Sequence, residues 1–349
     1  MAMLQLRHYS FELPFQYPFS TAHGTKTHQP TLVVSLGLGQ MRGYGEAPAI
    51  TYYDVSVADM VASLESKKAM IERYALTDPQ RFWHFLHHLI PGQHFLTAAL
   101  DIAGWDLFAQ LRKQPLYKLL GLRWENIPFT DYTIGLDDAE TMLAKLKAHP
   151  WPIYKIKCSR PGDIDKIALL RTETTARIRI DANEGWTFEE ARHLLPELHK
   201  LGVELAEQPL PRDAWEEMKE LKAISPIPIY ADESCRTEDE VRRCAEAFHG
   251  INIKLTKCGG ITPALRMIKE ARTLGLRVMM GSMNESTIGT AAIAHMLPLL
   301  DEAGADGPLL LREDVADGLH YDNGKMTVTD RPGLGIRATG VRPANYFGA

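Results

Sequence analysis

Polar side chains stand at the ends of several short apolar segments in the second half of the chain. Two lysines, Lys155 and Lys157, lie in the segment IYKIK, and Lys254 ends the segment INIK. Acidic residues end three segments of the same kind (RIRID, VELAE and IPIYAD), and these residues are Asp181, Glu207 and Asp232. Three carboxylates that converge on one point repel one another unless a cation neutralises them, and oxygen ligands suit Mg²⁺. We therefore expect a magnesium site formed by these three acids.

The lysines predict proton transfer beside that cation. Side chains alternate along a strand, so Lys155 and Lys157 point to one face while Tyr154 and Ile156 point to the other. The tyrosine and isoleucine suit a face covered by helices, which leaves both lysines facing inward. Two lysines are costly to bury without a function, and nearby positive charge lowers a lysine pKa toward that of a general base. We expect Lys157 and Lys254 to flank one carbon from opposite sides.

The elements that carry these residues recur along the chain. The segment ends lie roughly 25 residues apart from Lys157 to Gly281, with helical patterns such as FEEARHLLPELHKLG and PALRMIKEARTLG between them. A strand followed by a helix at this period indicates an α/β protein with a parallel barrel or an open parallel sheet. The chain has no GxGxxG or P-loop motif at a strand–helix turn, and polar residues end several strands. Both observations favour a barrel, whose strands together form one catalytic face.

The first part of the chain predicts a small α+β unit. Its alternating segments indicate strands at 3–15 and 31–38, and its apolar periodicity indicates helices at 54–74, 78–90 and 95–113. Asp54 is the expected N-cap of the first of these helices.

Composition excludes several classes of protein. The chain has 349 residues, a net charge of −5 and a pI near 6.2, which gives no reason to expect a nucleic-acid partner. Its four cysteines form no CxxC pair, as is usual in a reducing compartment. No segment is long and apolar enough to span a membrane, and the first residues lack the apolar core of a signal peptide. We expect a cytoplasmic protein that acts on a small molecule.

Together these motifs resemble the enolase superfamily, in its muconate-lactonizing-enzyme-like branch and close to its dipeptide epimerases. The resemblance rests on Lys155-Ile156-Lys157, on the three acids in Asp-Ala-Asn, Glu-Gln-Pro and Ala-Asp-Glu-Ser, and on Lys254 in NIKLTKCGG. It implies a modified (β/α)7β TIM-like barrel at 124–319, an α+β capping domain at 1–123, and a segment at 320–349 that packs back on the cap. It also implies an essential Mg²⁺ and an even-numbered homo-oligomer. Mandelate racemase relatives use a histidine base on the seventh strand, and VMMGSMNES has none.

The resemblance also assigns roles to the lysines and to the substrate contacts. It makes Lys157 and Lys254 the acid/base pair, and it gives Lys155 the task of polarising the substrate carboxylate. Dipeptide epimerases usually carry Asp-x-Asp on the eighth strand for the substrate's α-ammonium group. This chain has Gly304-Ala305-Asp306 there, so Asp306 alone is expected to pair with that group.

Further substrate contacts are expected around the site. Thr133, at the end of the first barrel strand, and Glu285, in the segment MNES, match positions near the site in the family. Residues 19–28, which include Lys26 and His23, match a loop that closes over substrate in the family, and either side chain could meet an acidic substrate side chain.

Several functions remain open at this point. The first is epimerisation of the C-terminal residue of a dipeptide, with Ala-Glu as the leading substrate, through an enediolate. The second is a one-base reaction on the same site, such as the dehydration of o-succinylbenzoate synthase or the cycloisomerisation of muconate. A barrel that only binds a ligand would not need three acids and three lysines, and a Schiff-base aldolase would not need the acids.

Overall fold

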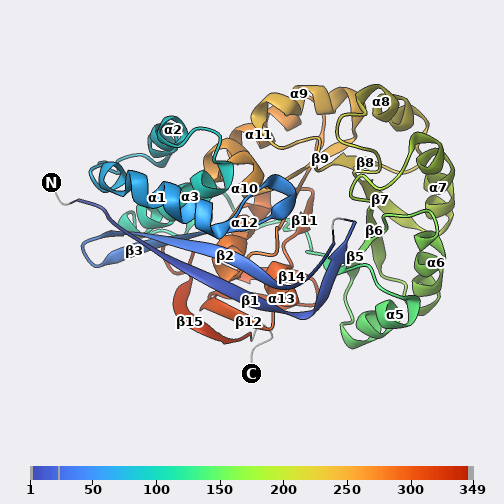
Figure 1. The fold of residues 1–349 in the computed structure, drawn as a ribbon, viewed down its shortest axis with the longest axis horizontal. Helices are drawn as coiled ribbons and strands as arrows, with labels where there is room; N and C mark the ends of the chain where they lie inside the picture. The colour runs from blue at the N-terminus through green and yellow to red at the C-terminus, as the bar shows by residue number, and fades with distance from the viewer. Residues whose placement is uncertain (1–2, 23, 345–349) are drawn as a thin grey trace.

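The computed structural model describes residues 3–22 and 24–344 of the chain. A three-stranded antiparallel sheet with its helices comes first, and an eight-stranded parallel sheet ringed by helices follows (Figure 1). The parallel sheet has the strand order β11-β10-β9-β8-β7-β6-β5-β4, and a bridge between Thr130 and Ala303 joins its two ends. The predicted α/β class and capped barrel are therefore confirmed.

The cap is built on a long hairpin of β1 (Gln5–Thr21) and β2 (Gly24–Leu38), with β3 (Met41–Pro48) beside β2. The strand β3 was not predicted because its glycines weaken the strand pattern. These glycines let its backbone pack directly on a helix. A Cβ atom at Gly45 would lie 1.9 Å from the carbonyl oxygen of Ala99, and one at Gly43 would lie 2.3 Å from that of Ala103.

Four helices and a 3-10 turn complete the cap, and they are η1 (Thr51–Tyr53), α1 (Val57–Glu72), α2 (Pro79–Leu89), α3 (His94–Leu111) and α4 (Leu116–Leu119). The expected N-cap at Asp54 is wrong. Asp54 ends η1 in the left-handed conformation with φ of 55°, and Ser56 caps α1 by accepting a hydrogen bond from the Asp59 amide. Asp54 and Ser56 both suit a helix start, and the turn η1 before them decides between the two.

The barrel alternates strands and helices from β4 to β11. Its strands are β4 (Tyr132–Ile134), β5 (Ile153–Lys157), β6 (Arg177–Asp181), β7 (Val203–Glu207), β8 (Ile229–Ala231), β9 (Gly250–Ile253), β10 (Arg277–Gly281) and β11 (Glu302–Gly304). Its helices are α5 (Ala139–Ala148), α6 (Asp163–Glu173), α7 (Phe188–Lys200), α8 (Trp215–Ile224), α9 (Glu238–Ala247), α10 (Leu255–Cys258), α11 (Ile261–Thr273) and α12 (Thr287–Met296), with η2 (Leu297–Leu299) after α12. In Figure 1 the helices α5 to α9 curve around the strands on the side away from the cap.

The alternation of side chains in the strands sets what faces the barrel interior. All five residues of β5 are buried, and Tyr154 and Ile156 belong to the core that the strands share with the surrounding helices. A separate small cluster of Leu205, Tyr230 and Met279 lies on the inner face, each two residues before Glu207, Asp232 and Gly281 respectively. Polar groups at the carboxyl ends of the same strands therefore lie above an apolar layer and face the cap.

The end of the chain returns to the cap. After α13 (Gly307–Leu310), it forms the antiparallel pairs β12 (Glu313–Asp317) with β15 (Arg337–Pro343), and β13 (Leu319–Asp322) with β14 (Lys325–Val328). The Leu334 amide donates to Asp106 on α3 at 2.8 Å, and the Leu116 amide donates to the carbonyl oxygen of Gly333 at 2.8 Å. Within the described residues, no helix combines the length and the apolar character needed to cross a membrane.

A buried carboxylate joins the cap to the barrel. Glu46 on β3 has an exposed fraction of 0%, and it accepts hydrogen bonds from the amides of Ser286 and Gly289 at 3.0 Å. The hydroxyls of Thr31 and Ser286 also donate to it. Glu46 therefore connects two strands of the cap to the start of α12.

Replacing Glu46 by alanine should lower the free energy of unfolding by about 3 kcal/mol, because buried donors on both sides of this contact lose their acceptor. Urea denaturation followed by circular dichroism measures the change. Glu46→Gln, which keeps an acceptor oxygen, should cost less. Equal stability of Glu46→Ala and the wild type would contradict this role of Glu46.

Candidate active site

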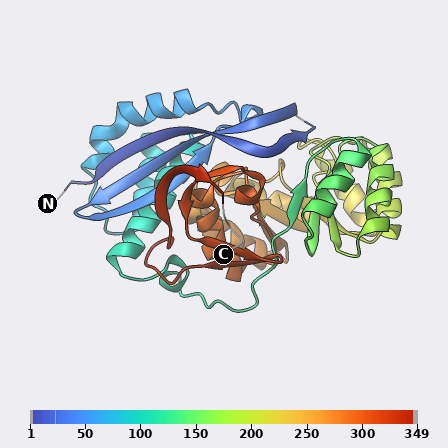
Figure 2. The same cartoon turned by 90° about the horizontal axis from the view of Figure 1, so that it is seen from below.

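A cavity of about 300 Å³ lies between the cap and the carboxyl ends of the barrel strands. The cap lines it with the tip of the β1–β2 hairpin, including Phe19 and Lys26, and with residues 50–53. Both ribbon views show this hairpin reaching over the barrel (Figures 1 and 2). The barrel contributes Lys155, Lys157 and Lys254, among other residues.

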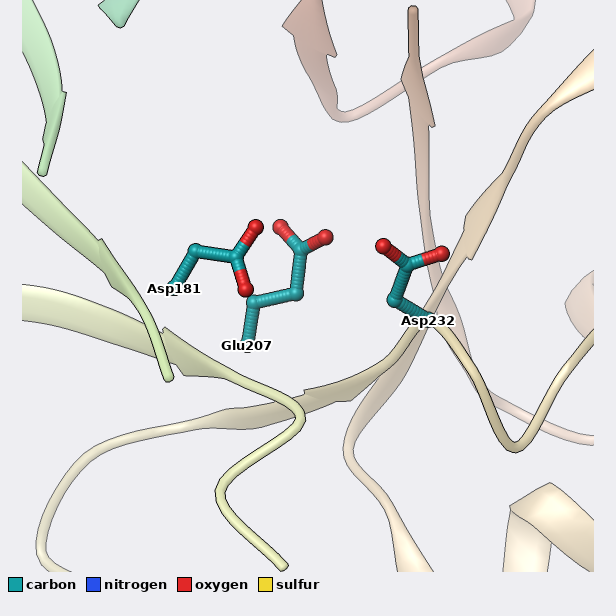
Figure 3. A group of neighbouring side chains, drawn as sticks. All are labelled: Asp181, Glu207 and Asp232. Atoms are coloured by element: carbon teal, nitrogen blue, oxygen red, sulfur yellow. The ribbon is translucent and has the colours of Figure 1, made fainter. Parts of the chain in front are cut away.

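The three predicted acids come together beside this cavity. Asp181 ends β6, Glu207 ends β7, and Asp232 directly follows β8. One oxygen from each lies within 4.8 Å of the others, and their carboxylates point toward a shared space in Figure 3. Their exposed fractions are 0%, 0% and 1%. Three buried carboxylates at this separation are hard oxygen donors, so the set fits a divalent cation such as Mg²⁺.

Lysine ammoniums from β5 pair with two of these acids. The Nζ of Lys155 lies 2.7 Å from Glu207 and 3.0 Å from Asp181, and the Nζ of Lys157 lies 2.7 Å from Asp181. Burial alone would lower the pKa of Lys155, but Asp181 and Glu207 outweigh burial and raise it well above the ordinary value. Burial likewise opposes ionisation of Asp181, and these lysines nevertheless hold its pKa at about 2. The sequence analysis expected positive neighbours to lower the pKa of the flanking lysine Lys254, but the carboxylates beside it raise that pKa instead.

A second pair of lysines meets the third acid from the other side of the barrel. The Nζ of Lys254 lies 2.6 Å from Asp232, and Lys257 donates to the other oxygen of the same carboxylate. Although burial lowers it, the pKa of Lys254 is raised by Asp232 and Glu207. Lys254 follows β9, which stands four places from β5 in the strand order. Lys157 and Lys254 therefore approach one cavity from opposite walls.

Amide side chains hold the acids in place. Asn183 accepts from Lys157 at 3.0 Å and also lines the cavity. Gln208 accepts from the amide of Asp232 at 3.0 Å, and Asn252 donates to Glu207 at 2.7 Å. The sequence analysis missed Asn252, although it stands two residues before Lys254 on a buried strand and so faces the interior as Lys254 does.

Some of the residues expected to contact substrate line the cavity, and others do not. Thr133, Asp306 and Lys26 line the cavity, and the Thr133 amide donates to Asp306 at 2.7 Å. Glu285 is absent from the lining, because its carboxylate turns back to accept from the Met283 amide at 2.6 Å. The expectation of a substrate contact at Glu285 does not fit this geometry. His23 lies outside the described residues.

Two further acids in the lining were not predicted. Glu233 accepts from Asn183 at 3.1 Å, and burial together with Asp232 raises its pKa to about 8. Asp131 lies just before β4 and accepts from Arg179 at 3.2 Å. The place of Asp131 could have been inferred from the sequence, because Asp131 precedes Thr133 by two residues and so shares its face of the strand.

Two known domain families match most of the chain. Residues 5–121 match the mandelate racemase/muconate lactonizing enzyme N-terminal domain, and residues 137–340 match the enolase C-terminal domain-like family. The chain belongs to the enolase superfamily.

Individual relatives show which members of the superfamily this chain is similar to. The L-Ala-D/L-amino acid epimerase of Flavobacterium johnsoniae is 43% identical over 333 residues, which cover 95% of this chain and 98% of that protein. A substrate-liganded L-Ala-D/L-Glu epimerase from Bacillus subtilis superposes with a TM-score of 0.92 at 29% identity, over 98% of this chain and 100% of that one. A dipeptide epimerase from Cytophaga hutchinsonii, complexed with Mg and D-Ala-L-Val, has a TM-score of 0.92 at 28% identity, over 97% and 96%. The prediction of an isomerase in this superfamily is confirmed.

Proposed function

We propose that this enzyme is a magnesium-dependent dipeptide epimerase that inverts the α-carbon of the C-terminal residue. The main support is the placement of Lys157 and Lys254 on opposite walls of one cavity, with three buried carboxylates beside them. Inversion needs one group to remove a proton from one face and another to return a proton on the opposite face. A single base would serve the dehydration or cycloisomerisation that the sequence also allows.

The reaction can be assigned to residues of the chain. Asp181, Glu207 and Asp232 would hold Mg²⁺, which when bound supplies positive charge for the substrate carboxylate and for the charge that develops as the α-proton leaves. Lys155, already beside two of these acids, donates hydrogen bonds to the same substrate carboxylate. One of the flanking lysines accepts the α-proton, and the other delivers a proton to the opposite face. The two lysines exchange these tasks when the other epimer is bound.

The lining of the cavity supports a dipeptide with an acidic C-terminal side chain. Asp306 provides a carboxylate for the α-ammonium group of the first residue. Lys26 on the hairpin provides a cation, whose pKa burial lowers, for an anionic side chain. The relatives include epimerases that act on L-Ala-D/L-Glu. L-Ala-D/L-Glu is therefore our leading substrate.

Proton NMR in D₂O with Mg²⁺ tests this function. The enzyme is incubated with L-Ala-L-Glu, L-Ala-L-Met and other dipeptides, and the α-proton of the C-terminal residue is followed. Loss of this signal with appearance of the diastereomer supports epimerisation. If no dipeptide exchanges its α-proton while a dehydration or cycloisomerisation substrate reacts, the proposed function is wrong.

Lys26 should make the enzyme prefer dipeptides with an acidic C-terminal side chain. Lys26→Met should lower kcat/KM for L-Ala-L-Glu about tenfold and leave kcat/KM for L-Ala-L-Met nearly unchanged, because only the glutamate carries an anion for Lys26 to meet. Steady-state kinetics with both dipeptides measures the ratio. An equal loss for both substrates would contradict this role.

The cap loop has a specific contact that should influence substrate binding. The hydroxyl of Tyr52 in η1 donates to Glu184 on the barrel at 2.5 Å, and Glu184 also accepts from the Arg212 amide at 2.7 Å. Tyr52→Phe should raise KM about three- to tenfold with little change in kcat, since it removes one charge-assisted hydrogen bond that holds the loop over the cavity. A double-mutant cycle with Glu184→Gln checks the coupling. Additive effects of the two changes would contradict it.

A further inference from the structure

One oxygen of Asp131 is buried without a hydrogen-bond partner beside the cavity. The side chain has an exposed fraction of 0%, and its Oδ2 accepts from Arg179 Nη1 at 3.2 Å. Its Oδ1 has no partner among the described residues. Burial of an unpaired carboxylate oxygen is costly, so this atom needs an explanation.

The unpaired oxygen faces Gly304 at the end of β11. A Cβ atom added to Gly304 would lie 3.3 Å from Asp131 Oδ1 and 3.1 Å from Met279 Cε. The φ of Gly304 is not among the positive values of the described chain, so its backbone conformation does not demand glycine. What glycine provides here is space, and both Gly304 and Asp131 line the cavity.

The positive side chains near Asp131 are already paired with other acids. Its partner Arg179 is shared, since the Nε of Arg179 also pairs with Glu204 at 2.5 Å. Asp306 lines the same cavity, and burial and the charge of Asp306 contribute to raising the pKa of Asp131 to about 7. The nearby Lys155 is already paired with two other acids. Asp131 therefore shares its one arginine with Glu204, and Asp306 accepts a hydrogen bond from the Thr133 amide.

We propose that Asp131 and Asp306, which flank the joint between the first and last barrel strands, together bind the α-ammonium group of the substrate. An ammonium group has three N–H donors, enough for both carboxylates. Asp131 thereby provides the second carboxylate that position 304 lacks in the Gly304-Ala305-Asp306 segment. This inference rests on the proposed function, because it assumes a substrate with a free amino terminus.

The test compares L-Ala-L-Glu with N-acetyl-L-Ala-L-Glu, which has no ammonium group, in the wild type and in Asp131→Asn. The wild type should favour the free dipeptide. Asp131→Asn should lower kcat/KM for the free dipeptide about 10- to 100-fold, mainly through KM, and so reduce the preference for the free over the acetylated dipeptide. Glu204→Gln is the matched control, since it removes the other acid on Arg179 and does not line the cavity.

The possible outcomes separate a failure of this inference from a failure of the proposed function. If the wild type favours the free dipeptide and Asp131→Asn keeps that preference, or if Glu204→Gln has the same effect as Asp131→Asn, the inference is overturned while the proposed function stands. If the wild type turns over the two forms equally or only the acetylated form, the inference is overturned while epimerisation stands; if neither form nor any other free dipeptide exchanges its α-proton, the proposed function and the inference both fail.

Gly304→Ala provides a second variant in case Asp131→Asn does not fold. Its methyl group would cover Oδ1 and displace only the flexible end of Met279. It should reduce the preference for the free dipeptide without changing the charge of the site. An unchanged preference in a folded Gly304→Ala protein would count against the inference.

Discussion

Lys254→Met should reduce epimerisation at least about 10³-fold in both directions, while the epimer whose α-proton faces Lys157 still exchanges that proton with D₂O. The variant keeps one base and loses the group that serves the opposite face. Exchange without inversion is therefore the expected signature of a single remaining lysine. Lys157→Met should give the mirror result, with exchange confined to the other epimer. Proton NMR of each pure epimer in D₂O measures exchange and inversion separately.

The fold should tolerate the loss of Lys254, because Lys257 still pairs with Asp232. Lys222→Met is the control, since Lys222 lies on the outer helix α8 and donates to the carbonyl oxygen of Ala245. It should retain full activity. If Lys254→Met or Lys157→Met inverts both epimers at the wild-type rate, the two-lysine mechanism is wrong.

The parts of the fold that follow a local pattern were predictable from the sequence. The expected strand ends at Lys157, Asp181, Glu207 and Gly281 are the last residues of β5, β6, β7 and β10, and Asp232 directly follows β8. Apolar segments bounded by turns define such strands, and their period defines the barrel. Because parallel strands present their carboxyl ends at one face, the meeting of the three acids also followed from the sequence.

Contacts that depend on distant parts of the chain were not predictable. Glu46 joins a cap strand to residues about 240 positions later, and its sequence surroundings give no sign of that. The partner of Gly304 is also remote in sequence, since Asp131 lies just before the first barrel strand and the barrel must close before the two meet. Glu285 was expected near substrate because its segment resembles that of the family, but the loop before α12 turns its carboxylate onto the Met283 amide.

The charge arrangement of the acids predicts how the enzyme should respond to loss of the metal. Lys155, Lys157, Lys254 and Lys257 already pair with the three acids, so the folded state does not depend on a cation to neutralise them. Chelation with EDTA should therefore leave the circular dichroism spectrum unchanged. It should nevertheless lower turnover at least about 10³-fold, because the charge that develops on the substrate then lacks its main stabilisation. Added Mg²⁺ should restore turnover and raise Tm.

Replacing one ligand separates metal binding from folding. Glu207→Gln keeps one oxygen, which can accept from Lys155, but loses the second acceptor oxygen and the negative charge, so titration calorimetry should show Mg²⁺ affinity lowered at least about tenfold. Glu302→Gln is the matched control, because Glu302 is a buried acid that begins β11, at the amino end of the barrel, where it pairs with Arg277 and Tyr230. It should bind Mg²⁺ as the wild type does. Equal Mg²⁺ affinity in both variants would mean that the cation binds elsewhere, and full activity in EDTA would mean that the lysines work without it.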